Sequence, residues 1–364
     1  MTRYLLAGGG TAGHVNPLLA VADRLRARDA AAEVLVLGTA EGLESRLVPE
    51  RGYELATIPK LPLPRRPTPA AIRFPFALRR TVRQVRRLIA DRGIDVVLGV
   101  GGYAAAPAYL AAHRERVPLV IHEANSIPGW ANRLGARYAD QVGIAFSGTP
   151  LPRARHVGLP LRPEIEALAA PGARLAMQAA AREFYGIAPE RPVLLVTGGS
   201  SGAQRINETV VAALDDVLAA GWDVLHASGG FRDAIPLQRE GYHPVAYLDR
   251  MDLAYAAADL SLGRAGTGTV LETAALGIPA VFVPYAVGNG EQARNAREAV
   301  AAGGAILVED AAFTPTAVRE TILPLLGDRG RLDSMATAMT SVGIPDGTAR
   351  AVALIDAAVA SRAR

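Results

Sequence analysis

The sequence predicts an α/β protein with two doubly wound parallel sheets, one in each half of the chain. Short apolar runs of β type alternate with helical stretches rich in Ala, Leu and Arg. A design of apolar strand, glycine turn and helix opens the chain at YLLAGGGTAGH and recurs about 190 residues later at VLLVTGGSSGAQ. Apolar strands between helices are typical of parallel sheets covered on both faces, so we expect two Rossmann-like halves.

Each apolar run has the length of a buried strand and precedes a helical stretch. The expected strands are residues 4–7, 34–37, 96–99, 119–122, 141–145, 193–197, 223–227, 260–262 and 280–284. Prolines 160 and 163 in GLPLRPE break helix and sheet, which places the domain boundary there. We therefore expect domains at 1–160 and 161–346, an extra helix at 173–185, and a last helix at 347–364 that packs back on the first domain.

The composition is that of a globular protein with more than one core. The chain has 364 residues, of which 50% are hydrophobic and 20% are charged, and this length exceeds the usual size of one core. The lack of cysteine excludes disulfides and thiolate chemistry and fits the cytosol. We see no signal peptide and no apolar run of the ~18 residues that a membrane span needs.

The first glycine turn predicts a diphosphate site. Gly8, Gly10 and Gly13 fit the G-x-G-x-x-G pattern, in which a helix start and its free N–H groups face an anion. An NAD site would need an acidic residue at the end of the second strand. That strand ends in Gly38 and Thr39, and Glu41 comes too late. The turn therefore favours a diphosphate that is not part of NAD.

Two further polar clusters follow strands of the same half. VLGVGGYAAAP supplies Gly101, Gly102 and Tyr103, and IHEANSIPG supplies 122–125. Carboxyl ends of parallel strands line one edge of a sheet, so these clusters should meet the first turn. His14, at a helix start beside that turn, is the candidate for chemistry. A lone histidine such as that at position 122 is more often structural.

Five motifs carry a resemblance over nearly the whole chain. GGGTAGHVNP, VLGVGGYAAAP, HEANSIPGWANRL, GGSSGAQRIN and GRAGTGTVLETAALGIPAVFVPYAVGNGEQARNA resemble the MurG family, in the form of its actinobacterial branch. The resemblance implies a GT-B fold. It also implies inverting transfer of GlcNAc from UDP-GlcNAc to the MurNAc 4-hydroxyl of lipid I, giving lipid II. No cofactor and no metal are implied, and the sequence has no D-x-D motif.

The resemblance also assigns roles to individual residues. His14 would be the general base, although it could instead anchor the acceptor phosphate. The acceptor diphosphate would be bound by Gly10, Gly13, His14, Gly101, Gly102 and Tyr103. The donor would be bound by Thr11, Ala12, Gly13, Asn125, Arg162, Ser200, Leu248, Thr267, Gly268, Thr269, Val270, Leu271, Glu272, Gln292 and Asn295. In this reading Glu272 accepts the ribose hydroxyls, and Gln292 and Asn295 face the sugar.

Three positions depart from the common family pattern. Leu159 stands where Asn is frequent, Glu291 replaces the first Gln of a Gln-Gln pair, and Ala12 replaces a glycine. Alternatives stay open: another GT-B enzyme that uses a UDP-sugar (a natural-product glycosyltransferase or a UDP-GlcNAc 2-epimerase), a non-catalytic UDP-GlcNAc sensor or division scaffold, and, least favoured, an NAD oxidoreductase.

The segment 60–92 is basic and amphipathic. It contains Lys60, the chain's lone lysine, nine arginines and one acidic residue, Asp91. The apolar residues among them are Ile72, Phe74, Phe76, Leu78, Val82 and Val85. This pattern fits either anionic lipid headgroups or a solvated helix with its core face. With the resemblance it implies a peripheral enzyme on the cytoplasmic face of the membrane. The expected partners are UDP-GlcNAc, lipid I, anionic inner-leaflet lipids and the cell-wall and division machinery, with no nucleic acid.

Overall fold

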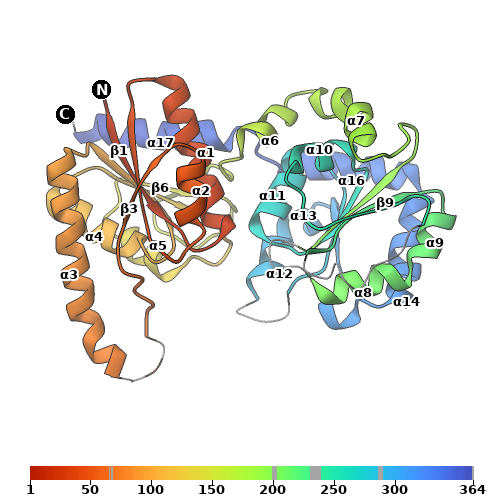
Figure 1. Cartoon of the computed structure of the whole chain (residues 1–364), viewed down its shortest axis with the longest axis horizontal. Coiled ribbons are helices and arrows are strands. Elements are labelled where there is room, and N and C mark those ends of the chain that lie inside the picture. The colour runs from red at the N-terminus through yellow and green to blue at the C-terminus, as the bar shows by residue number, and fades with distance from the viewer. Residues whose placement is uncertain (65, 67–68, 199–202, 230–238, 286–289, 363–364) are drawn as a thin grey trace. The chain divides into compact units, whose positions relative to one another are not determined.

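The chain divides into two compact α/β units. The computed structural model describes all residues except 65, 67–68, 199–202, 230–238, 286–289 and 363–364 (Figure 1). Unit 1 comprises Met1–Pro163 and Asp346–Arg364, and unit 2 comprises Glu164–Pro345. Each unit holds one parallel sheet, so the α/β class predicted from the sequence is confirmed.

Unit 1 is a doubly wound sheet with strand order β3-β2-β1-β4-β5-β6-β7, and all its described pairings are parallel. The order runs outward from β1 in both directions, which creates the switch point typical of ligand-binding sheets between β1 and β4. Its elements are β1 (Arg3–Gly8), α1 (Ala12–Arg28), β2 (Glu33–Gly38), α2 (Glu44–Glu50), β3 (Glu54–Thr57), α3 (Pro69–Arg92), β4 (Val96–Gly101), α4 (Ala105–Glu115), β5 (Leu119–Glu123), α5 (Trp130–Gly135), β6 (Gln141–Ile144), β7 (Ala154–His156) and α17 (Gly347–Arg362).

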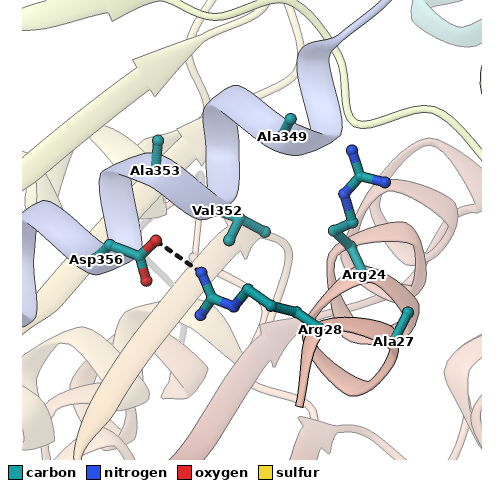
Figure 2. Close-up of a pocket in the computed structure, with 7 residues that line it drawn as sticks. All are labelled: Arg24, Ala27, Arg28, Ala349, Val352, Ala353 and Asp356. Atoms are coloured by element: carbon teal, nitrogen blue, oxygen red, sulfur yellow. Dashed lines mark hydrogen bonds and ion pairs between the residues drawn. The ribbon is translucent and has the colours of Figure 1, made fainter.

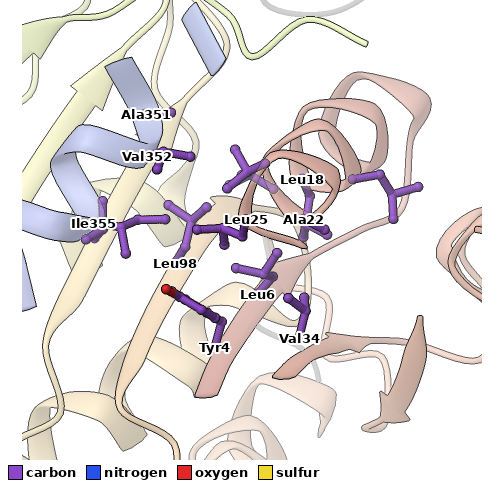
Figure 3. Close-up of a cluster of buried hydrophobic side chains, with 14 of the residues drawn as sticks. Tyr4, Leu6, Leu18, Ala22, Leu25, Val34, Leu98, Ala351, Val352 and Ile355 are labelled. Carbon is purple, nitrogen blue, oxygen red and sulfur yellow. The ribbon is translucent and has the colours of Figure 1, made fainter. Parts of the chain in front are cut away.

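Alternation along the strands of unit 1 supplies two hydrophobic layers. Leu6 and Val34 face α1 and α17 (Figure 3), whereas Leu5 and Leu35 belong to the layer under α3 and α4. Successive side chains of a strand point to opposite faces, so apolar strands without polar interruption are what a sheet covered on both sides requires.

The last helix, α17, belongs to unit 1 although it follows unit 2 in the chain. Its buried face includes Val352 and Ile355 (Figure 3). At its start, the Thr348 hydroxyl lies 3.1 Å from both the N–H and the carbonyl oxygen of Leu161. A Cβ added at Gly347 would overlap the backbone of Leu159, so the helix start packs directly on the segment that leads into unit 2.

Unit 2 repeats the design with strand order β10-β9-β8-β11-β12-β13. Its core contains Leu194, Val196 and Leu262 from the central strands. Its elements are α6 (Pro163–Leu168), α7 (Ala173–Phe184), β8 (Val193–Thr197), α8 (Gln204–Ala212), α9 (Leu214–Ala219), β9 (Asp223–Ala227), β10 (Tyr242–Val245), α10 (Met251–Ala257), β11 (Leu260–Gly263), α11 (Thr267–Ala275), β12 (Ala280–Phe282), α12 (Glu291–Asn295), α13 (Arg297–Ala301), β13 (Ala305–Leu307), η2 (Asp310–Ala312), α14 (Pro315–Ala317), η3 (Val318–Ile322), α15 (Leu323–Leu326) and α16 (Arg329–Val342).

Candidate active site

The first glycine turn joins β1 to α1 and is built over a buried carboxylate. Gly9 and Gly10 have φ angles of 153° and 95°, which favour glycine. The Gly10 N–H donates to Glu44 Oε2 at 2.7 Å. The Thr39 N–H and hydroxyl donate to Glu44 Oε1 at 2.8 and 2.9 Å. A Cβ at Gly9 would overlap this carboxylate, so the turn is shaped around Glu44.

The Glu44 carboxylate is charged although its residue is only 1% exposed. Burial raises the pKa of Glu44, but the N–H bonds from Gly10 and Thr39 outweigh burial and hold that pKa below its ordinary value. The Gly10 N–H is therefore already used. The amides at the start of α1, those of Ala12 and Gly13, come before the first intrahelical bonds and are the ones that a helix start offers to an anion.

His14 lies in the first turn of α1, beside the second glycine turn. Its Nδ1 is 3.2 Å from the Thr11 hydroxyl, and its Nε2 is 3.2 Å from the position of a Cβ added at Gly101. A Cβ at Gly102 would overlap the carbonyl oxygen of Gly9, so the two turns are in close contact. The structure thus brings the two glycine turns and His14 together at one edge of the sheet.

The surroundings of His14 keep its imidazole neutral. Burial lowers the pKa of His14, and the negative charge of Glu44 offsets part of this effect. A neutral imidazole has a lone pair that can accept a proton, as a general base requires.

A buried polar network supports the second turn. Asn132, 1% exposed on α5, accepts from the Tyr109 hydroxyl at 2.6 Å and donates to Glu123 Oε2 at 2.9 Å. Glu123 Oε1 accepts from the Asn125 N–H at 2.9 Å. The sequence motifs indicate Asn125 as a site residue but do not indicate Asn132 or Tyr109. The string HEANSIPGWAN is the signal for Asn132, because its two asparagines follow the end of β5 closely.

His122 has the structural role predicted for it from the sequence. Its Nε2 lies 2.8 Å from the Gly158 carbonyl oxygen, and the residue is 1% exposed. Burial lowers the pKa of His122 to about 4. Tyr103 behaves differently, because it is 39% exposed and its ring lies 4.9 Å below the Lys60 ammonium. Arg162 is half-buried in the segment that leads into α6.

In unit 2, the start of α11 is tied to α12. Asn295 is 1% exposed, and its amide nitrogen lies 3.3 Å from the Thr267 hydroxyl and 3.4 Å from the Ala265 carbonyl oxygen. This amide therefore holds the helix start. The predicted residues 267–272 form the first turns of α11 after Gly266 as N-cap, with Glu272 one turn beyond Gly268.

The Glu272 carboxylate is oriented by a neighbouring phenol. The Tyr255 hydroxyl, on α10, donates to Glu272 Oε2 at 3.0 Å. Tyr255 is only 1% exposed, so this bond holds the carboxylate from the buried side. Tyr255 is not predicted from the sequence, because nothing in AYLDRMDLAYAAAD distinguishes a core tyrosine from a positioning one.

A second group of polar side chains follows β11 and β12. The Gln292 Oε1 accepts from the Tyr285 N–H at 2.8 Å. Arg264, 9% exposed, donates to the Val283 carbonyl oxygen at 3.0 Å and pairs with Asp310 at 2.5 Å. Its guanidinium lies 5.4 Å over the Tyr285 ring.

Leu248 lines a hollow of about 360 Å³ in unit 2. Tyr247, 66% exposed, is its neighbour in that lining and offers an open aromatic surface. Tyr185 closes another side, and its hydroxyl donates to the Arg250 carbonyl oxygen at 3.0 Å. Ser200, the remaining donor-site prediction, lies outside the described residues.

A hollow of about 380 Å³ between α1 and α17 contains none of the predicted residues (Figure 2). Arg28 crosses it to pair with Asp356 at 2.7 Å.

Among the residues that the structure describes, no group of three or more His, Cys, Asp or Glu could hold a metal ion. Within the same residues, every helix is too short or too polar to cross a bilayer.

Helix α3 has two distinct halves. Val82 and Val85 are 2% and 0% exposed and pack in the core, as expected for the core face of a solvated helix and not for a membrane-facing surface. Ile72 and Phe76 are 74% and 76% exposed. Phe74 contacts Trp130 edge to face at 6.4 Å. The exposed apolar surface, which we call the α3 patch (Ile72, Phe74, Phe76 and Trp130), is therefore confined to the first turns of α3 and the start of α5.

Comparisons with known proteins identify the family. Residues 4–144 match the glycosyltransferase family 28 N-terminal domain, and residues 193–350 match its C-terminal domain. The chain is 61% identical over 355 residues to the UDP-N-acetylglucosamine--N-acetylmuramyl-(pentapeptide) pyrophosphoryl-undecaprenol N-acetylglucosamine transferase of Leifsonia xyli subsp. xyli, covering 98% of each protein. The Streptomyces coelicolor protein of the same name is 48% identical over 367 residues and 100% of both chains.

A solved structure agrees with these relatives. The crystal structure of Acinetobacter baumannii MurG matches with a TM-score of 0.80 and 28% identity over 98% of this chain and 99% of that one. The chain belongs to the MurG family. Its two-sheet GT-B fold is shared more widely, since the UDP-GlcNAc 2-epimerase of Neisseria meningitidis matches at a TM-score of 0.69 with 15% identity over 97% of this chain and 99% of that one. At 15% identity this chain and the epimerase have only the fold in common. The MurG relatives, in contrast, resemble this chain in sequence over both units.

Proposed function

We propose that this chain transfers GlcNAc from UDP-GlcNAc to the MurNAc 4-hydroxyl of lipid I, producing lipid II and UDP in peptidoglycan synthesis. Its membership of the MurG family and the names of its full-length relatives support this activity. The observation that carries the residue-level proposal is the neutral His14 at the start of α1, in contact with two glycine turns.

The acceptor diphosphate binds at the start of α1. The amides of Ala12 and Gly13 and the positive end of the helix dipole attract the anion. Gly101, Gly102 and Tyr103 form the adjoining wall. The Gly10 N–H bonds to Glu44, so the predicted contact between Gly10 and the acceptor does not use this donor.

His14 acts as the general base of an inverting displacement. It takes the proton of the MurNAc 4-hydroxyl while that oxygen bonds to the anomeric carbon of GlcNAc. The bond from this carbon to the UDP phosphate oxygen breaks on the opposite side, and UDP leaves with the electron pair. Fixed N–H groups and positive charge stabilise the leaving diphosphate.

Unit 2 binds the nucleotide sugar. Glu272 accepts the ribose hydroxyls, the start of α11 faces the diphosphate, and the hollow at Leu248 receives the uracil. Gln292 donates its amide nitrogen to the sugar. Asn295 acts one step back, because its buried amide holds Thr267. Contacts of Thr11, Ala12, Gly13, Asn125, Arg162 and Ser200 with the donor stay predictions.

A transfer assay tests this function. Labelled UDP-GlcNAc and a lipid I analogue are mixed in detergent with the protein and with His14→Ala. We expect label in the lipid fraction with an equal amount of UDP, and about a 100-fold or greater fall in kcat for His14→Ala with UDP-GlcNAc binding unchanged. Saturable UDP-GlcNAc binding without transfer would favour a sensor. Equal losses of turnover and of UDP binding in the variant would reject His14 as the base.

We further propose that unit 1 binds the cytoplasmic face of the membrane through the α3 patch, which would place the enzyme beside its lipid-linked acceptor. Exposed apolar side chains of this kind insert between lipids, and the exposed arginines 79, 80 and 83 next to them suit anionic headgroups. Contact with the cell-wall and division machinery stays a prediction.

A further inference from the structure

Glu44 is a buried carboxylate of unit 1 that the proposed mechanism does not use. It lies on α2, outside all five motifs, yet it bonds to the first glycine turn and to the residue that follows β2. A buried carboxylate costs stability unless hydrogen bonds compensate for it, and this one has three donors. Such an arrangement in a turn that binds an anion needs a reason, because the charge itself repels the diphosphate.

The surrounding glycines show how closely the backbone is fitted to this side chain. A Cβ at Gly9, Gly38 or Gly42 would overlap atoms of Glu44 in each case. The three glycines come from the turn after β1, the end of β2 and the loop before α2. The Glu44 side chain therefore lies against the backbone of these three segments, and side chains at the three glycine positions would not fit beside it.

Only a glutamate meets the requirements of this position. Both carboxylate oxygens accept from N–H groups, Oε1 from Thr39 and Oε2 from Gly10. A glutamine would place its own NH₂ against one of those donors. An aspartate would keep the charge but would be one methylene too short to reach both.

We propose that Glu44 is a positioning residue of the acceptor site: its carboxylate fixes the Gly9–Gly10 peptide, and so directs the first amides of α1 toward the diphosphate and keeps His14 at the second glycine turn. This rests on the proposed function. The same charge favours the protonated form of His14, so it assists the base after proton transfer and compensates for its repulsion of the acceptor. Thr11 and Gly101, which the structure places beside His14, carry no charge.

The test compares Glu44→Gln with Glu41→Gln, which removes the same charge from an exposed position three residues earlier. Steady-state kinetics and the NMR titration of the His14 imidazole are measured on the full chain. For Glu44→Gln we expect kcat/KM for a lipid I analogue to fall about tenfold or more, the effect of losing one bond to a charged group. KM for UDP-GlcNAc should stay within about twofold, since no donor contact is removed. The titration of His14 should move to lower pH because the negative charge is gone. Glu41→Gln should match the wild type in all three.

A merely structural role would lower stability and leave kcat/KM for the lipid I analogue unchanged in the folded protein, whereas loss of the charge moves the His14 titration in either case. Wild-type kinetics in folded Glu44→Gln would therefore overturn the proposal. If Glu44→Gln does not fold, Glu44→Asp is used, which should lose lipid I turnover while keeping the titration near that of the wild type; full turnover in Glu44→Asp would equally overturn it. The titration needs no turnover, so a wild type that fails to transfer GlcNAc would count against the proposed function alone.

Discussion

At the residue scale, substitutions of Tyr255 and Glu272 distinguish a residue that binds the nucleotide directly from one that positions the binding residue. Glu272→Gln keeps the shape of the side chain but loses the charge that we propose accepts two ribose hydroxyls. We expect its affinity for UDP-GlcNAc to fall about 10- to 100-fold. Tyr255→Phe removes only the hydroxyl that orients the carboxylate at 3.0 Å, so a smaller loss of about threefold is expected.

Calorimetric titration with UDP-GlcNAc and with its 2′-deoxyribose analogue checks both variants. The wild type should distinguish the two nucleotides, and Glu272→Gln should not. Glu320→Gln, at an exposed position of the same unit, is the matched control. If Glu272→Gln still discriminates against the deoxyribose analogue, the ribose role of Glu272 is wrong.

The residues that the sequence reveals are those whose neighbours in the chain carry the signal. His14 stands beside the glycines that define its turn, and Glu272 lies on the helix that begins with AGTGT. Glu44 is 34 residues from Gly10, its bonding partner, and Tyr255 is 17 residues from Glu272. Such pairs are created by strand order, because α2 and the β1–α1 turn meet only once β1 and β2 lie side by side. Periodicity and motifs do not contain that information.

At the element scale, the nine predicted strands are all present, and each described strand that the prediction omits lies at a sheet edge. These are β3 and β7 in unit 1 and β10 and β13 in unit 2. Edge strands are covered incompletely, as the half-buried ELAT of β3 shows. They therefore lack the continuous apolar run by which the inner strands are recognised. Helix α3 shows the same limit of sequence patterns. Its apolar residues follow one pattern, but Val82 and Val85 are buried in the core whereas Ile72 and Phe76 are exposed to solvent.

The two halves of α3 predict a separable effect on membrane binding. Ile72→Ser with Phe76→Ser should reduce binding to vesicles with and without anionic lipid, by about tenfold, because exposed apolar area is lost. Arg79→Ser, Arg80→Ser and Arg83→Ser together should reduce binding only to anionic vesicles and only at low salt. Arg86 is left in place because it pairs with Glu115 at 2.5 Å.

Vesicle flotation at two salt concentrations measures both effects. Arg114→Ser with Arg137→Ser, at exposed positions of the same unit outside α3, provides the control for loss of charge. Unchanged flotation of the Ile72/Phe76 variant would exclude the α3 patch as the membrane contact, whatever the arginines do.

At the scale of the whole molecule, each unit contains a histidine, 1% exposed or less, whose burial keeps it neutral in the folded protein. Burial lowers the pKa of His122 in unit 1 and of His226 in unit 2 to about 4. Unfolded histidine titrates near 6.5, so between about pH 6.5 and pH 4 the unfolded chain binds more protons than the folded one. Each histidine therefore does not reduce the free energy of unfolding above pH 6.5. As the pH decreases from 6.5 to 4, each histidine lowers the free energy of unfolding by up to about 1.4 kcal/mol per pH unit.

The position of the two tryptophans allows unit 2 to be followed alone. Trp222 is buried there and donates to the Leu326 carbonyl oxygen at 3.0 Å, whereas Trp130 lies in unit 1. In a Trp130→Phe background, urea unfolding followed by Trp222 fluorescence should show the free energy of unfolding decreasing from pH 7 to pH 5. His226→Gln should lower stability at both values, since it weakens the bonds to Tyr242 and Asn207, but it should flatten the dependence on pH.

The slope, rather than the absolute stability, decides this prediction. His113→Gln, which changes an exposed histidine of unit 1, should leave the slope of unit 2 unchanged. His122→Gln should also leave it unchanged while flattening the corresponding slope of unit 1, because each histidine acts on the core that surrounds it. An identical slope in His226→Gln and its parent would mean that other groups, such as the carboxylates of unit 2, account for its acid sensitivity.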